Sequence, residues 1–179
     1  VRARAAHRAV EEAALAVLPA LAGAPTVVLA DVGRLRPGDP PSAALRSAGV
    51  VLIVHRQATA SASAATVRVE RLVESVEELA HLDAEFVLAV IGRSPFDPAE
   101  IGQFVGEAVP DTLHHTVALS DDPLAAVTLA GRSGVSAKRL RRLPLMRDAA
   151  RLAGDLVDLL PPDRAPRTAP HFESEDAST

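Results

Sequence analysis

Four short apolar runs are spread along the chain and separated by longer mixed segments. They predict strands over Thr26–Asp31, Val50–Val54, Phe86–Ile91 and Thr112–Leu119. Continuous apolar character, in place of strict alternation, is typical of strands buried on both faces of a parallel sheet. We therefore expect the core to form around such a sheet.

Between these runs, apolar residues recur every three or four positions, which indicates amphipathic helices. The predicted helices cover about Arg2–Ala22, Ala43–Ala48, Ser61–His81, a stretch that begins after Asp97, a stretch from Pro123 to near Gly131, and Met146–Leu160. The sequence Asp97-Pro98-Ala99-Glu100 supplies an N-cap, a first-turn proline and an acid three residues after the cap. Lys138–Leu145 is expected to be a basic connection.

Alternating strands and helices predict one α/β domain of three layers, with a mostly parallel sheet covered by helices on both faces. We assign residues 1–160 to this domain. Residues 161–179 carry several prolines and the acidic run Glu173-Ser174-Glu175-Asp176, without periodicity. They are expected to be a disordered tail.

Composition narrows the classes of function. The 179 residues are 48% hydrophobic but only 2% aromatic, which disfavours base stacking on aromatic platforms. The formal net charge of −4 argues against general attraction to nucleic acid. No cysteine is present, which excludes disulfides and thiolate metal sites and is compatible with the expected cytoplasmic location. No apolar stretch is long enough to predict a transmembrane segment.

Asp31 is the strongest candidate for a ligand-binding residue, because ligands of open α/β sheets bind at the carboxyl ends of strands. Its carboxylate could hold Mg²⁺ through water, while Gly33 would let the backbone approach a phosphate. The alternative, which we favour, is that Asp31 caps a turn that Gly33 permits.

Other strand ends offer further candidates. His55, Arg56 and Gln57 follow the second run, and Arg93 follows the third. Each is expected to be solvated, with a ligand-facing role as the alternative. His114 and His115 cannot converge on one metal ion from a strand, because adjacent side chains point to opposite faces.

A cluster of cations is the strongest charge feature, with six in sixteen residues. It consists of Arg132, Lys138, Arg139, Arg141, Arg142 and Arg147. This patch could contact DNA phosphates, anionic lipid or an acidic partner. The alternative is that it neutralises the acidic Glu70–Glu78 helix of the same or a neighbouring subunit.

The order of elements resembles the C-terminal two-thirds of a ParA/MinD-like P-loop ATPase, the deviant-Walker group that includes chromosome-partitioning and division-site-placement proteins. The matching segments are Val28-Leu29-Ala30-Asp31-Val32-Gly33, Val50–Val54, Val90-Ile91-Gly92-Arg93, Ser120-Asp121-Asp122 and Ala130-Gly131-Arg132. The resemblance spans roughly Thr26 to Leu160. It implies a P-loop NTPase-like fold that is incomplete at the N-terminus.

The resemblance also implies positions for a Mg-ATP site. Asp31 would lie near the Mg²⁺-bound water, Arg93 near the adenine, and Asp121 in the loop beside the base. The chain departs from the family at Gly92, where an Asn usually reads adenine, and the sequence contains no G-x-x-x-x-G-K-[ST] phosphate loop.

Three functional hypotheses follow. The first is a non-catalytic or truncated ParA/MinD-like protein with a regulatory or partner role in chromosome partitioning or cellular positioning, acting on another protein or on a second copy of itself. The second is an active ATPase whose phosphate loop precedes Val1. The third is a nucleotide-independent α/β interaction domain.

Overall fold

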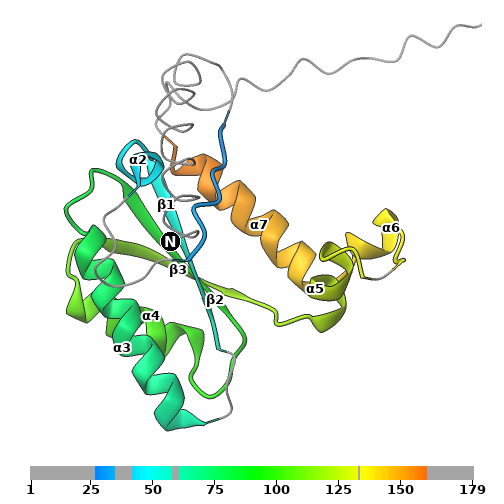
Figure 1. Cartoon of the computed structure of the whole chain (residues 1–179), viewed down its shortest axis with the longest axis horizontal. Coiled ribbons are helices and arrows are strands. Elements are labelled where there is room, and N and C mark those ends of the chain that lie inside the picture. The colour runs from blue at the N-terminus through cyan, green and yellow to red at the C-terminus, as the bar shows by residue number, and fades with distance from the viewer. Residues whose placement is uncertain (1–26, 35–41, 58–60, 133, 161–179) are drawn as a thin grey trace, which may run out of the picture.

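The computed structural model of the chain describes residues 27–34, 42–57, 61–132 and 134–160. Figure 1 shows its α/β architecture, in which a central sheet lies between helices. The predicted helix over Arg2–Ala22 and the predicted tail over residues 161–179 lie outside the described residues.

Three parallel strands form the sheet, in the order β1-β2-β3. They are β1 (Val50–Arg56), β2 (Glu85–Ile91) and β3 (Leu113–Leu119). β1 and β2 pair in continuous register, whereas a bulge between Phe86 and Val87 shifts the register of β2 against β3. The three later predicted strands are therefore confirmed, with boundaries that differ by one or two residues.

The predicted strand over Thr26–Asp31 is wrong for the residues that the structure describes. Residues 27–34 have no regular secondary structure, and Leu29 is 87% exposed. Only Val32 of this segment packs against the main core. An apolar run becomes a strand only where a neighbouring strand accepts its backbone hydrogen bonds and covers its side chains, and sequence pattern does not reveal that neighbour.

Two helices cover one face of the sheet. These are α3 (Ala62–Leu79) and α4 (Pro98–Ala108), which connect consecutive parallel strands and lie on the same side (Figure 1). Their apolar stripes pack with the strand residues that point to this face. The resulting core cluster includes Val51, Ile53, Val69, Val76, Phe86, Leu88, Val90, Ile101 and Val105.

The opposite face is covered by α7 (Pro144–Asp158), which packs against β3. Leu152 of this helix joins Val87, Ala89 and Leu119 in a second, smaller core cluster. The three-layer α/β arrangement expected from the sequence is thus present.

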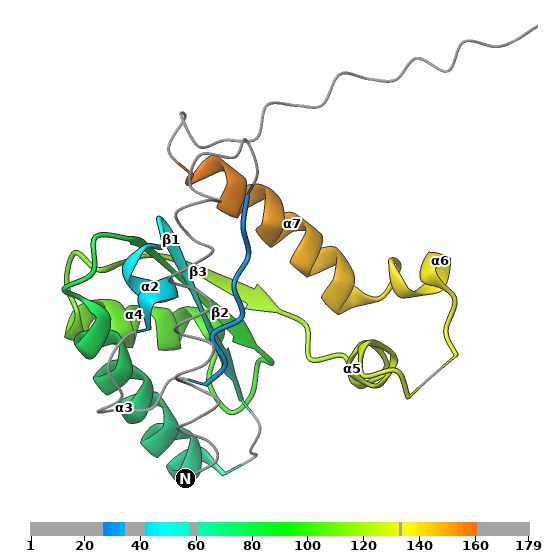
Figure 2. The same ribbon diagram turned by 45° about the horizontal axis from the view of Figure 1, so that its top comes forward.

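The connection from β3 to α7 projects away from the sheet. It contains α5 (Pro123–Leu129) and α6 (Ala137–Leu140), which lie beyond the N-terminal end of α7 (Figure 2). Asp122 caps α5 by accepting a hydrogen bond from the Ala125 amide at 3.0 Å. Where the sequence predicted a basic connection over Lys138–Leu145, the structure has the short helix α6 and the first turn of α7. The remaining short helix, α2 (Ala43–Arg46), precedes β1.

The start of α4 forms as its sequence predicts. Asp97 accepts a hydrogen bond from the Ala99 amide at 2.8 Å, and Glu100 accepts one from the Asp97 amide at 2.9 Å. One turn later, Gly102 lets the helix approach β3 closely, because a Cβ at this position would overlap the Thr116 side chain. Gly102 therefore fixes the distance between α4 and the third strand.

Replacing Gly102 by Ala is expected to destabilise the protein by about 1–2 kcal/mol. Overpacking costs ~1–3 kcal/mol, and the better helix propensity of Ala offsets up to ~1 kcal/mol of it. Urea unfolding measures this change. In the same helix, Gly106→Ala is the matched control, because its new Cβ would meet no atom within 4 Å. That control should be stabilised, and an equal gain for Gly102→Ala would contradict the close approach.

Candidate functional site

The carboxyl ends of the three strands form one edge of the sheet, and this edge is the candidate site. Hydrogen bonding continues past the strand ends. The Gln57 amide donates to the Ile91 carbonyl, and the Gly92 amide donates to the Leu119 carbonyl, each at 3.0 Å. The segments after the strands are thereby held in a fixed arrangement.

An ion pair spans this edge. Arg56, the last residue of β1, donates from Nη2 to Oδ1 of Asp121, two residues after β3, at 2.8 Å. Gly92 lies between them with φ +91°, and a Cβ there would come within 3.9 Å of the Asp121 Cβ. The pair is about half exposed, so its contribution to stability is of the order of 0.2–1 kcal/mol. Its main effect is that the Arg56 guanidinium and the Asp121 carboxylate are paired with each other next to the end of the central strand β2.

Gln57 fixes the loop that follows β2. Its side chain is buried, and its Nε2 donates to the carbonyls of Gly92 at 3.0 Å and Phe96 at 2.8 Å. Its Oε1 accepts a hydrogen bond from the Phe96 amide at 3.1 Å. One side chain therefore satisfies three backbone groups in the segment that leads to α4.

The loop after β3 is attached to α7. Ser120 donates from both its amide and its hydroxyl to Oδ2 of Asp148, at 2.9 and 2.6 Å. These hydrogen bonds lower the pKa of Asp148, the hydroxyl bond contributing most, while Arg151 and Arg147 add smaller effects and partial burial opposes them. The third strand end is thus held by an ionised carboxylate on the covering helix.

His55 points away from Arg56 because adjacent residues of a strand face opposite sides of the sheet. Burial, followed by the nearby charge of Arg68, lowers the pKa of His55. The imidazole faces α3, and its lowered pKa disfavours the charged form that would bind an anion at the strand ends.

A hollow of about 350 Å³ lies beside the start of α4. It is lined by Arg93, Asp97, Pro98, Ala99, Gly102, Gln103, Thr116 and Ala118. Arg93 is the one cation of this lining, and the Asp97 carboxylate already occupies the helix N-terminus. A phosphate at this position would therefore meet a like charge where the helix dipole would otherwise attract it.

The residues that the sequence predicts to bind a nucleotide do not come together in the structure. Asp31 accepts a hydrogen bond from the Gly33 amide at 2.9 Å, with Gly33 at φ +76°, in the exposed segment that precedes α2. This turn has the form of the alternative in which Asp31 caps the chain and Gly33 permits the bend. Asp121 pairs with Arg56, whereas Arg93 lines the hollow beside α4.

Sequence reasoning did not find the contacts made by Gln57 and Ser120, and the expectation that Gln57 is solvated is wrong, because its side chain is buried. A glutamine after a strand and a serine before an acidic turn are common, and their partners are 39 and 28 residues away in sequence. The one sequence feature that could have indicated these contacts is position, because both residues follow strands whose carboxyl ends lie at the same edge of the sheet. His115 is exposed on β3, and no group of three or more His, Asp or Glu residues suited to a metal ion occurs in the described ranges.

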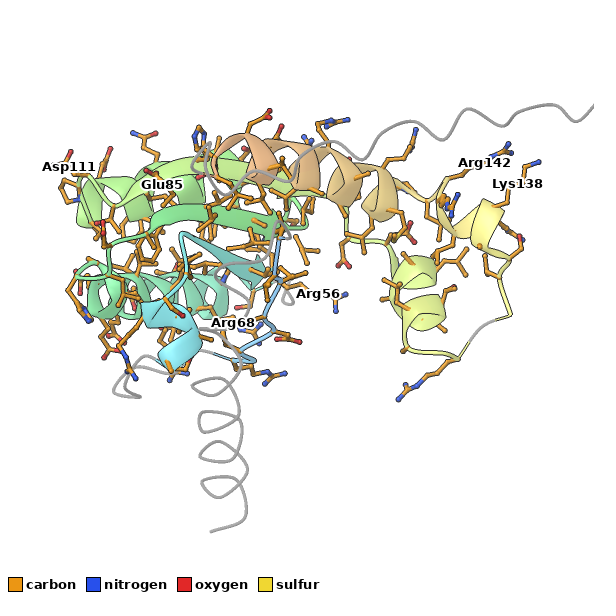
Figure 3. All side chains as sticks on the ribbon, turned by 90° about the horizontal axis from the view of Figure 1, so that it is seen from above. Arg56, Arg68, Glu85, Asp111, Lys138 and Arg142 are labelled. Carbon is orange, nitrogen blue, oxygen red and sulfur yellow. The ribbon has the colours of Figure 1, made fainter. Side chains whose placement is uncertain are left out.

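The six cations of the predicted interaction patch lie in the projecting connection and the first turn of α7, and all are exposed. Figure 3 shows Lys138 and Arg142 at the outer end of this projection, far from the body that carries the strand ends. The patch and the candidate site are therefore separate surfaces. None of the helices in the described part of the chain has the length and apolar character needed to cross a membrane.

Replacing Gln57 by Ala is expected to destabilise the protein by about 1–3 kcal/mol, because partly buried backbone groups of Gly92 and Phe96 would lose their partners. Chemical denaturation measures the change. Gln103→Ala is the matched control, since Gln103 is exposed and bonds only to Glu107 on the same helix. That control should stay within about 0.5 kcal/mol of the wild type. Equal effects of the two substitutions would argue against the role of Gln57.

The Ser120–Asp148 contact predicts a pH dependence of stability. The pKa of Asp148 is lower in the folded chain than its ordinary value of 3.8, so the contact stabilises the fold fully above that value and loses its effect as pH falls through the folded pKa. Ser120→Ala should raise the Asp148 pKa, which carboxyl NMR titration measures directly.

The stability difference between wild type and Ser120→Ala should therefore shrink in the acid range. Ser47→Ala is the control, because the Ser47 hydroxyl bonds only to backbone carbonyls of α2 and its effect should not vary there. An unchanged Asp148 pKa in Ser120→Ala would contradict the assigned cause.

Comparison with known proteins gives no relative: the sequence matches no protein-family model, and neither a curated protein nor a solved structure is significantly similar to it.

Proposed function

We propose that this chain is a non-catalytic protein of the ParA/MinD-like ATPase-fold type that acts as a partner or regulator in chromosome partitioning or cellular positioning. The three parallel strands with connecting helices are compatible with this fold type, but the first strand that the resemblance implies, Thr26–Asp31, is not present among the described residues. Support for the non-catalytic role comes from the strand ends.

The Arg56–Asp121 ion pair is the observation that carries the proposal. Nucleotides and other ligands of open α/β sheets bind outside the carboxyl ends of the strands, where free polar groups must be available. Here a cation from β1 and an acid after β3 neutralise each other across the central strand at 2.8 Å. A ligand at this edge would first have to break that pair.

The neighbouring groups are also engaged. The Gln57 side-chain amide forms hydrogen bonds with the loop after β2, and the Asp148 carboxylate accepts a hydrogen bond from Ser120. Arg93 lies beside a helix start that is already capped by a carboxylate. These features favour contacts with macromolecules over turnover of a nucleotide.

The proposal predicts that the chain does not bind Mg-ATP or Mg-ADP with a Kd below about 1 mM. Isothermal titration calorimetry on the whole chain measures this, and phosphate release measures turnover. Asp121→Ala tests the strand-end site, whereas Asp31→Ala, in the exposed turn, serves as the comparison at the other predicted position.

Saturable binding with hydrolysis that disappears in Asp121→Ala would overturn the non-catalytic role and favour an active ATPase. Saturable binding lost only in Asp31→Ala would instead locate a nucleotide site in the segment before α2. Absence of binding in all three proteins is the expected result.

A further inference from the structure

The projection between β3 and α7 carries a concentrated positive charge. We define the basic arm as residues 123–147, which include α5, α6 and the first turn of α7. It contains six cations and no acid, so the rest of the chain carries 13 of the 19 cations against all 23 acids, a net charge of −10. In the described part of the chain, none of the six side chains forms an ion pair. The arm is available for an anionic surface.

The basic arm also exposes apolar side chains. Leu124, Val127 and Leu129 of α5 are 37%, 43% and 60% exposed, and only Ala125 of this helix is buried. Apolar groups surrounded by charge are typical of protein interfaces, where they form the centre and the charges form the rim. The composition of the arm therefore suits a protein partner that is acidic and has an apolar position of its own.

A surface of this kind lies on α3. Glu70, Glu74 and Glu77 follow one another at helical spacing on the side of α3 that faces away from its buried residues Leu72, Val76 and Leu79. Val67, which is 47% exposed, begins the same row. We call these four residues the acidic stripe. Arg68 and Arg71 are also exposed on α3, and they flank the stripe.

The arm and the stripe of one chain cannot meet. α3 and α6 lie on opposite sides of the molecule along its longest axis, with the sheet and α7 between them (Figures 1 and 2). Neutralisation within the same subunit, one of the expectations from the sequence, is therefore excluded for these two surfaces. The stripe of another copy is within reach of the arm.

We propose that the basic arm of one copy binds the acidic stripe on α3 of a second copy. Charge complementarity favours this occupant over lipid or nucleic acid, because a body of net charge −10 would be repelled by an anionic membrane or a phosphate backbone. The contact is heterologous, since the two surfaces differ. After one such contact forms, one copy still has a free arm and the other still has a free stripe. Association therefore extends beyond a dimer or closes into a ring.

This inference deepens the proposed function by naming a partner, and it rests on that function only in treating the chain as an interaction protein. Sedimentation velocity on the whole chain, over a range of concentrations at low salt, should show a mass that rises beyond that of a dimer. Raising NaCl from about 0.05 to 0.5 M should weaken association by at least about tenfold, because the rim charges become screened.

Charge reversal identifies the surfaces. Lys138→Glu/Arg142→Glu reverses the arm, and Glu70→Lys/Glu74→Lys reverses the stripe. Each variant alone should associate at least about tenfold more weakly than the wild type. An equimolar mixture should recover association, because the reversed arm of one variant complements the reversed stripe of the other.

Arg34→Glu/Arg93→Glu is the matched control for the reversed arm, since it makes the same change in net charge as that variant at exposed positions outside both surfaces. It should associate like the wild type, and circular dichroism checks that every variant is folded. A monomeric wild type at all concentrations, a mixture that fails to recover, or a control as weak as the arm variant would each overturn the proposal.

A monomeric wild type that binds anionic vesicles or DNA through the arm would likewise overturn it and assign the arm to that surface. These outcomes are independent of the calorimetry with Mg-ATP. Failure of self-association leaves the non-catalytic role standing, and nucleotide binding leaves the arm contact standing.

Discussion

Burial of β2 on both faces is the constraint on which the rest of the structure depends. Phe86, Leu88 and Val90 face α3 and α4, Val87 and Ala89 face α7, and none of the five is more than 1% exposed. Burying a Val, Leu or Phe side chain contributes about 1.5–3 kcal/mol. Burial of this single strand therefore strongly favours packing of helices on both faces of the sheet. The position of the central strand then fixes where the loops at its carboxyl end must lie.

The candidate site follows from this position. Because β2 ends between β1 and β3, the groups that leave the two flanking strands face each other over Gly92. Arg56 and Asp121 meet there, and Gln57 reaches the loop beneath them. The charged groups at this edge are therefore paired with each other while remaining about half exposed. This pairing is the observation on which the proposed interaction role rests.

The distribution of charge supports the same role. Positive charge is concentrated on a projection that adds little to the core, since Ala125 is the one buried residue of α5 and α6 has none. A segment with few buried contacts contributes little to stability, so its composition is free to serve recognition. Negative charge lies on the far side of the sheet, on the outward face of α3. Because the two surfaces are separated within one chain, the proposed pairing between them is intermolecular.

Sequence pattern alone determined much of the framework. It located β1, β2 and β3, the amphipathic faces of α3 and α4, and the cap at Asp97, because burial periodicity and capping are local properties. It failed at Thr26–Asp31, where the run Val27–Leu29 is apolar but has no strand beside it among the described residues. The tertiary structure decided that Arg56 pairs with Asp121, that Gln57 holds Phe96, and that the basic arm lies far from α3. Those outcomes depend on which distant segments the sheet order brings together, and a local pattern carries no information about contacts between residues separated by tens of positions.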